Sequence, residues 1–123
     1  MLKKGVLWGC GYGAASILLG AFISHGLKGA VSKKDLEILE ISSRYLMYVA
    51  IPLLMLSLTH GQWQWPNLLF NIFILSGVLF SGSLIAYVAI QWHWLVFVTP
   101  IGGGLMVLSW AHLGYVAIRK INW

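Results

Sequence analysis

Long apolar runs constrain the fold of this chain more than any other feature. The first run, residues 5–24, contains no charged residue. A helix of about 20 residues rises about 30 Å, which matches the hydrocarbon core of a bilayer. Residues 68–90 and 94–118 form two further runs of this kind, and residues 41–60 form another when the run before His60 is extended to a full span. The sequence therefore predicts four transmembrane helices.

The composition excludes a soluble protein. Charged residues make up 9% of the chain and hydrophobic residues 59%, whereas soluble domains contain roughly 25% charged residues. The basic residues all flank the apolar runs, as expected of residues that orient a membrane protein on anionic headgroups. A nucleic-acid partner is therefore not expected. These residues are Lys3, Lys4, Lys28, Lys33, Lys34, Arg44, Arg119 and Lys120.

The only substantial polar stretch lies between the first two spans. Ser32 and Asp35 have the spacing of a helix capping box, and the apolar residues that follow share one helical face. This pattern predicts a short amphipathic helix in the membrane interface. The predicted fold is an all-α integral membrane protein: one four-helix transmembrane bundle, residues 1–123, with this interfacial helix between spans one and two.

Small residues recur at helical spacing along the first span. Gly9, Gly13 and Gly20 lie on one face, and glycine at such positions allows close approach of another helix. The partner helix belongs either to the bundle or to a second copy in a homo-oligomer. The basic residues divide equally between the two ends of the spans, but the first helix usually dominates orientation. Because Lys3 and Lys4 immediately precede it, both termini are predicted to be cytoplasmic.

No catalytic or metal-binding signature is present, so neither an enzyme, a metal nor a cofactor is expected. The four histidines fall in separate segments, and the three acidic residues all belong to the interfacial stretch. Four antiparallel spans nevertheless bring several polar residues to the end of the bundle away from the termini. We predict a polar ligand-binding site there, formed by His25, Glu40, Arg44, Tyr48, Ser83 and Thr99.

Arg44 admits two interpretations. It lies about one turn inside its span, where a charge usually faces protein or water, and it shares a helical face with Glu40 and Tyr48. It then points into the bundle, and its planar fork of donors suits an anionic headgroup. Alternatively, its side chain snorkels to the headgroup layer with Glu40 as its partner.

Three blocks of the sequence resemble the YgdD-like family of small bacterial inner-membrane proteins. They are residues 19–27, residues 40–48 and the pair formed by residues 80–83 and 99–103. The resemblance implies a four-helix inner-membrane protein with its termini inside, and it implies no activity. The chain departs from the family at Ile23-Ser24, usually Gly-Ala, and at Val49, which is a histidine in many relatives.

Together these features predict a noncatalytic accessory or interaction protein, or a bundle that binds a lipid or another amphiphile. The expected partners are membrane lipids, a second copy of the chain or another membrane protein. The alternative is an oligomeric transporter or channel for a small solute or ion.

Overall fold

The computed structural model describes residues 2–27 and 29–121. Within these residues, four helical units are long and apolar enough to cross a membrane: Lys3–His25, Lys33–Trp63, Asn67–Ile90 and His93–Lys120. The prediction of four transmembrane helices is confirmed. Lys28, one of the basic residues counted above, lies outside the described residues, as do the chain ends at 1 and 122–123.

The first two spans are single helices, and the last two contain a change of helix type. α1 is Leu2–His25 and α2 is Lys33–Trp63. The third span consists of α3 (Asn67–Gly77), a π-helical turn η1 (Val78–Gly82) and α4 (Ser83–Ile90); the fourth consists of a 3₁₀ turn η2 (His93–Phe97) and α5 (Val98–Lys120).

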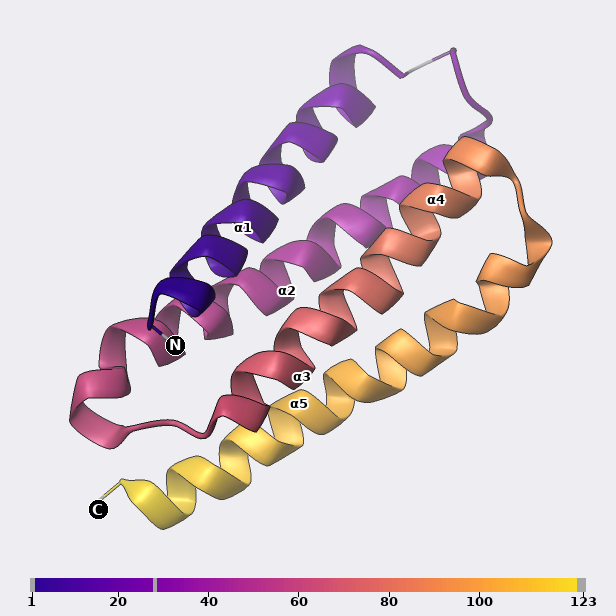
Figure 1. Cartoon of the computed structure of the whole chain (residues 1–123). Helices are drawn as coiled ribbons and strands as arrows, with labels where there is room; N and C mark the ends of the chain where they lie inside the picture. Colours follow the sequence, from indigo (N-terminus) through magenta and orange to yellow (C-terminus); the bar gives the residue numbers. More distant parts are fainter. Residues whose placement is uncertain (1, 28, 122–123) are drawn as a thin grey trace.

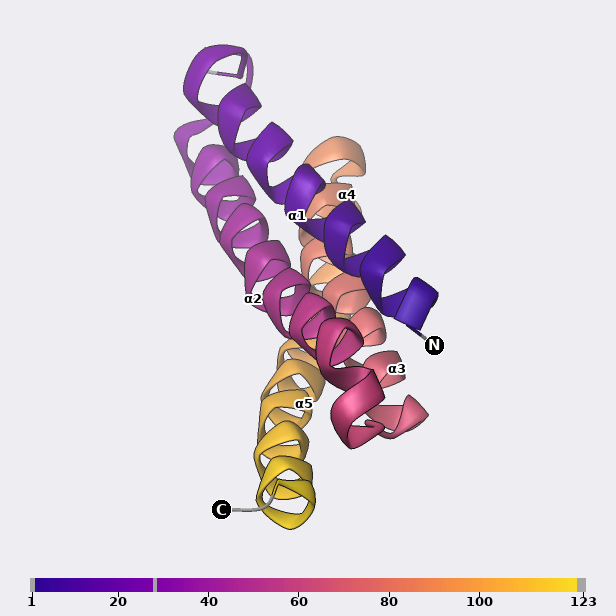
Figure 2. The ribbon, with the colours of Figure 1, turned by 90° about the vertical axis from the view of Figure 1, so that its left-hand side faces the viewer.

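The spans are arranged side by side in the order of the sequence (Figure 1). α1 packs on α2, α2 packs along the third span, and α5 packs on α3 and η1. In Figure 2, α1 and α5 lie well apart. The most apolar stretches of these two outer spans are 22% buried, against 44% in α2 and 39% in the third span. The inner pair therefore forms the core, and the outer pair covers it.

Both termini lie at one end of the molecule, together with the turn between α2 and α3 (Figure 1). At this end, Lys4 Nζ donates hydrogen bonds to the side-chain oxygens of Asn67 and Asn71. These bonds tie the start of α1 to the start of α3. The α1–α2 connection and the turn between α4 and η2 lie at the other end, which below is called the distal end.

The predicted separate interfacial helix is wrong in one respect, because it is continuous with the second span. α2 runs for 31 residues without a break. Ser32 caps it as the capping box predicted, with its hydroxyl accepting a hydrogen bond from the Asp35 amide at 3.1 Å. No glycine lies between residues 33 and 60, and the first proline is Pro52. Nothing therefore stops the helix as it enters the span.

The glycine row of α1 lies against α2 inside the same chain. A Cβ atom on Gly9 would stand 2.9 Å from Leu54 Cγ and 3.2 Å from the Ala50 carbonyl oxygen. On Gly13 it would make an ordinary contact with Ala50 at 3.8 Å, and on Gly20 with the Ser43 hydroxyl at 3.6 Å. Gly5 and Gly9 therefore leave too little room for a Cβ atom, whereas Gly13 and Gly20 lie at ordinary contact distances from α2.

Candidate functional site

Two reciprocal serine pairs hold α2 between its neighbours. Ser43 and Ser16 of α1 each donate a hydroxyl hydrogen to the backbone carbonyl of the other, at 2.8 and 2.7 Å. Ser42 and Ser81 of η1 form the same arrangement at 3.1 and 3.0 Å. Serine hydroxyls commonly form hydrogen bonds between transmembrane helices, because lipid tails offer them no hydrogen-bond partner. Adjacent serines of α2 thus bind two different spans at one depth.

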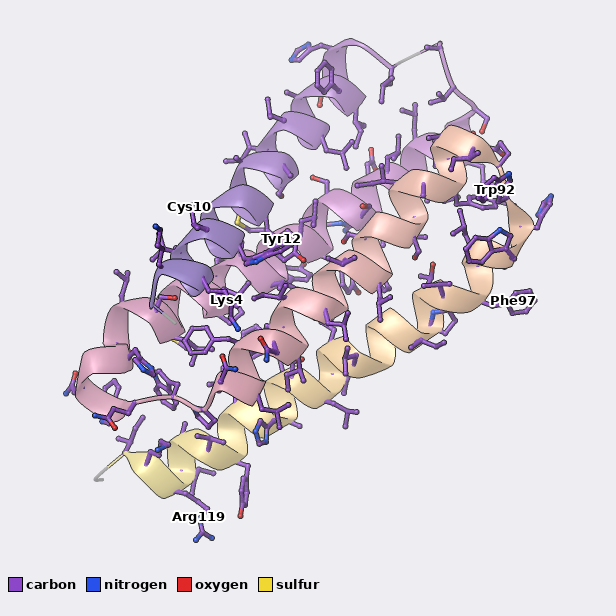
Figure 3. All side chains as sticks on the ribbon, in the orientation of Figure 1. Lys4, Cys10, Tyr12, Trp92, Phe97 and Arg119 are labelled. Carbon is purple, nitrogen blue, oxygen red and sulfur yellow. The ribbon has the colours of Figure 1, made fainter. Side chains whose placement is uncertain are left out.

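Three other spans contact the third span at the π-helical turn η1 or at the end of α3 just before it. The Tyr12 ring covers Gly77, where a Cβ would stand 2.8 Å from ring carbons, and the Tyr12 hydroxyl donates to the Ile74 carbonyl (Figure 3). On the other side, the Gly102 backbone of α5 lies directly on the backbone of Phe80. Such π turns often occur at functional sites. Here the turn supplies Ser81 and Phe80 as docking points.

Ser83 and Thr99 form a pair rather than lining a pocket. Their hydroxyl oxygens lie 2.6 Å apart, across the contact between α4 and α5. Ser83 is also bonded to the Phe80 carbonyl, and Thr99 to the Leu95 carbonyl. Both hydroxyls are therefore used in packing the third span against the fourth.

Glu40 and Arg44 line a groove between α1 and α2 at the distal end. Its volume is about 370 Å³, and we call it the Arg44 groove; its lining residues are Gly20, Ile23, Ser24, Glu40, Ser43 and Arg44. Both charged side chains are exposed. In the part of the chain that the structure describes, no ion pair joins Glu40 to Arg44. The groove contains two hydroxyls, those of Ser24 and Ser43. The Ser43 hydroxyl donates to the Ser16 carbonyl, which leaves the Ser24 hydroxyl as the donor for a ligand.

Tyr48, one turn after Arg44 on α2, does not line the Arg44 groove. It lines a second groove of about 430 Å³, the aromatic groove, formed by Tyr45, Tyr48, Gly103, Met106, Val107 and Trp110. Tyr45 packs against Phe80 of η1 in a tilted arrangement with ring centroids 4.6 Å apart, and edge to face against Tyr48 at 5.1 Å. This groove is almost wholly apolar apart from the tyrosine hydroxyls.

The structure therefore does not bring the six predicted residues together at one site. Glu40 and Arg44 share the Arg44 groove, Tyr48 lies in the aromatic groove, and Ser83 bonds to Thr99. His25 lies on another side of α1, among Leu18, Ala21, Phe22 and Gly26. Arg44 is an exposed residue of the Arg44 groove.

Sequence reasoning missed the serine pairs. Ser16, Ser42 and Ser81 are buried hydroxyl residues inside or beside apolar runs, and that placement alone predicts interhelical hydrogen bonds. His60, at the end of the second span, has a structural hydrogen bond: its Nδ1 accepts from the Trp65 amide at 3.0 Å. Among the described residues, no group of three histidine, cysteine or acidic side chains could hold a metal ion.

Comparison with known proteins identifies the family. A family model described as "Protein of unknown function (DUF423)" matches residues 19–103. Residue 19 begins the first of the sequence blocks that resemble the YgdD-like family, and residue 103 ends the last of them. No solved structure is a significant match to the chain.

Several curated relatives share the name UPF0382 membrane protein. The protein from Staphylococcus epidermidis is 36% identical over 106 residues, covering 81% of this chain and 83% of the relative. The Haemophilus influenzae protein is 32% identical and covers 85% of both chains. YwdK of Bacillus subtilis is 28% identical over 98% of this chain and 100% of its own length. The chain belongs to the DUF423 family, whose matched relatives are named UPF0382 membrane proteins.

Proposed function

We propose that this protein is a noncatalytic membrane protein that binds a phospholipid, with the headgroup in the Arg44 groove. The observation that carries the proposal is a volume of about 370 Å³ between two spans that contains a guanidinium and a hydroxyl, those of Arg44 and Ser24. A guanidinium offers five donors in a planar fork, which pairs bidentately with a phosphate.

The depth of the groove suits a headgroup. α2 contains 31 residues and therefore rises about 46 Å, about 16 Å more than the hydrocarbon core. With Trp63 at the opposite interface, the surplus falls on the residues before Arg44. Arg44 then lies at the boundary between acyl chains and headgroups, where a phosphate resides.

Below Arg44, α2 offers a surface for an acyl chain. Tyr48, Ile51, Met55 and Leu58 follow at intervals of four and three residues and are all exposed, from 44% to 78%. Residues at this spacing form one stripe on a helix. The acyl chain of a lipid whose phosphate binds Arg44 would lie along this stripe. One lipid molecule would then contact both the Arg44 groove and the apolar stripe.

The proposed location is the inner membrane of a bacterium, with both termini cytoplasmic. Lys3 and Lys4 before the first span, and Arg119 and Lys120 after the last, support this orientation. The Arg44 groove would then face the outer leaflet. The bound lipid would be an outer-leaflet phospholipid.

The test is lipid retention after transfer from native membranes into mild detergent, measured by native mass spectrometry of the intact protein. We expect wild type to retain phospholipid and Arg44→Gln to lose most of it. Arg44→Lys keeps the charge but not the fork, so retention should fall to an intermediate level. Arg119→Gln is the matched control, because Arg119 is an exposed arginine at the other end. Equal retention in all four proteins would refute the proposal.

A further inference from the structure

We propose that the Arg44 groove selects phospholipids whose headgroup carries a primary amine, with Arg44 binding the phosphate and Glu40 binding the ammonium. This inference rests on the proposed function and specifies its ligand. A groove built only for anionic lipid would gain nothing from a carboxylate. This groove contains one among its six lining residues.

The two charges form a complementary pair of sites rather than an internal ion pair. Glu40 and Arg44 are four residues apart on α2, so their Cβ atoms lie about 5–6 Å apart on one face. Both are exposed and line the same groove. Within the described residues no ion pair joins them. The carboxylate and the guanidinium are therefore both available to a ligand with opposite charges at a matching separation.

A phosphoethanolamine group has that arrangement. Two methylenes separate its phosphate ester oxygen from its ammonium, which puts the two charged groups roughly one helical turn apart. The ammonium offers three donors to the Glu40 carboxylate, while the phosphate accepts from Arg44 and the Ser24 hydroxyl.

Apart from Arg44, the lining gives Glu40 no competing cation. Gly20, Ile23, Ser24 and Ser43 carry no charge, and the Ser43 hydroxyl is engaged with the Ser16 carbonyl. An anionic headgroup such as phosphoglycerol would satisfy Arg44 but place its hydroxyls beside Glu40 without neutralising it. A choline headgroup has the charge but no N–H donor. The groove therefore ranks the amine headgroup first.

The experiment measures competition among three lipids in nanodiscs of equal parts phosphatidylethanolamine, phosphatidylglycerol and phosphatidylcholine, with bound lipid counted by native mass spectrometry. We expect wild type to retain phosphatidylethanolamine about three- to fivefold above its share relative to phosphatidylglycerol, a modest factor because the pair is exposed. Glu40→Gln should abolish this preference while total lipid retention persists. Glu37→Gln is the control, since Glu37 is an exposed acid of the same helix outside the groove lining.

The outcomes separate this inference from the proposed function. If wild type prefers phosphatidylglycerol, or if Glu40→Gln leaves the ratio unchanged, the amine selectivity is refuted even where Arg44→Gln still loses lipid. If Arg44→Gln retains lipid as wild type does, lipid binding itself fails. A titration with soluble glycerophosphoethanolamine distinguishes the source of the ligand. Saturable binding of this soluble compound to wild type, lost in both Glu40→Gln and Arg44→Gln, would assign the site to the free headgroup compound. Displacement of the bound lipid only by another lipid supports a membrane ligand.

Discussion

At the scale of single residues, Gly102 is a position that requires glycine. Gly102 of α5 rests on the peptide backbone of Phe80, and a Cβ atom there would overlap main-chain atoms rather than a movable side chain. Two residues further on, no atom of a neighbouring helix lies within 4 Å of the position a Cβ on Gly104 would occupy. The same residue type is thus required at one site and replaceable at the other.

We predict that Gly102→Ala lowers the unfolding free energy by about 1–3 kcal/mol, the usual cost of overpacking. Gly104→Ala should leave it unchanged or raise it, because alanine has a higher helix propensity by up to about 1 kcal/mol. Equilibrium unfolding of both variants in mixed micelles provides the comparison. Equal destabilisation by the two substitutions would show that α5 does not dock on η1 at Gly102.

The residues of the predicted site show what counting along the sequence can and cannot supply. Antiparallel spans determine the depth of each residue, and Glu40, Arg44, Ser83 and Thr99 do lie toward the distal end. Counting does not determine how each helix is rotated about its axis. Arg44 and Tyr48 share a face by spacing, yet they line grooves with different partners, α1 and α5. Rotation depends on which side chains pack, and that is a property of the assembled molecule.

At the scale of helices, the spans are joined by two kinds of hydroxyl contact. In the Ser42–Ser81 and Ser16–Ser43 pairs, each hydroxyl donates to the other residue's backbone carbonyl, so each pair contains two separate bonds. In the Ser83–Thr99 pair, one bond joins the two hydroxyl oxygens themselves. The two kinds respond differently to removal of a side chain.

Double-mutant cycles should therefore give opposite results for the two kinds of pair. Ser42→Ala and Ser81→Ala each remove one bond and leave the other, so we expect losses of about 0.6 kcal/mol each that add in the double variant. Ser83→Ala and Thr99→Val each remove the single shared bond. The double variant should then cost less than the sum, with a coupling energy of about 0.6 kcal/mol.

The measurement is the unfolding free energy of each single and double variant under one set of detergent conditions. A clear coupling energy in the Ser42–Ser81 cycle would contradict two independent bonds. Strict additivity in the Ser83–Thr99 cycle would contradict a shared one.

Secondary structure was predictable where the apolar pattern is long and less so where helix type changes. The four spans follow from run length, and the Ser32 cap follows from its spacing to Asp35. Continuity of α2 was not predicted, because a change from amphipathic to fully apolar sequence marks the water boundary without ending a helix. The π turn Val78–Gly82 has no signature in hydropathy. It carries Ser81 and Phe80, which contact α2 and α5 respectively.

At the scale of the whole molecule, the fold is a bundle of four spans with an extended distal end. The first turns of α2 extend beyond the depth at which the apolar runs end, and Lys34 on those turns is exposed. Met55, within the apolar part of the same helix, is also exposed, but lipid covers that depth. A side chain that no other part of the protein covers is therefore exposed to water at Lys34 but to lipid at Met55.

We predict that Lys34→Cys, in a Cys10→Ser background, reacts with a membrane-impermeant maleimide. The reagent is added to cells whose outer layers have been removed and whose plasma membrane is intact. Met55→Cys in the same background should remain unlabelled, because its side chain faces acyl chains. Labelling of Lys34→Cys only after the cells are lysed would reverse the proposed orientation while preserving the four spans. Labelling of Met55→Cys would mean that this face of α2 borders water.

The side-by-side order of the spans has a consequence for biogenesis. Each span after the first packs on a span that precedes it in the chain: α2 on α1, the third span on α2, and α5 on α3 and η1. No docking step has to wait for a distant segment to leave the ribosome. The architecture can therefore assemble in the order of translation, one span at a time, as each leaves the insertion machinery for the bilayer.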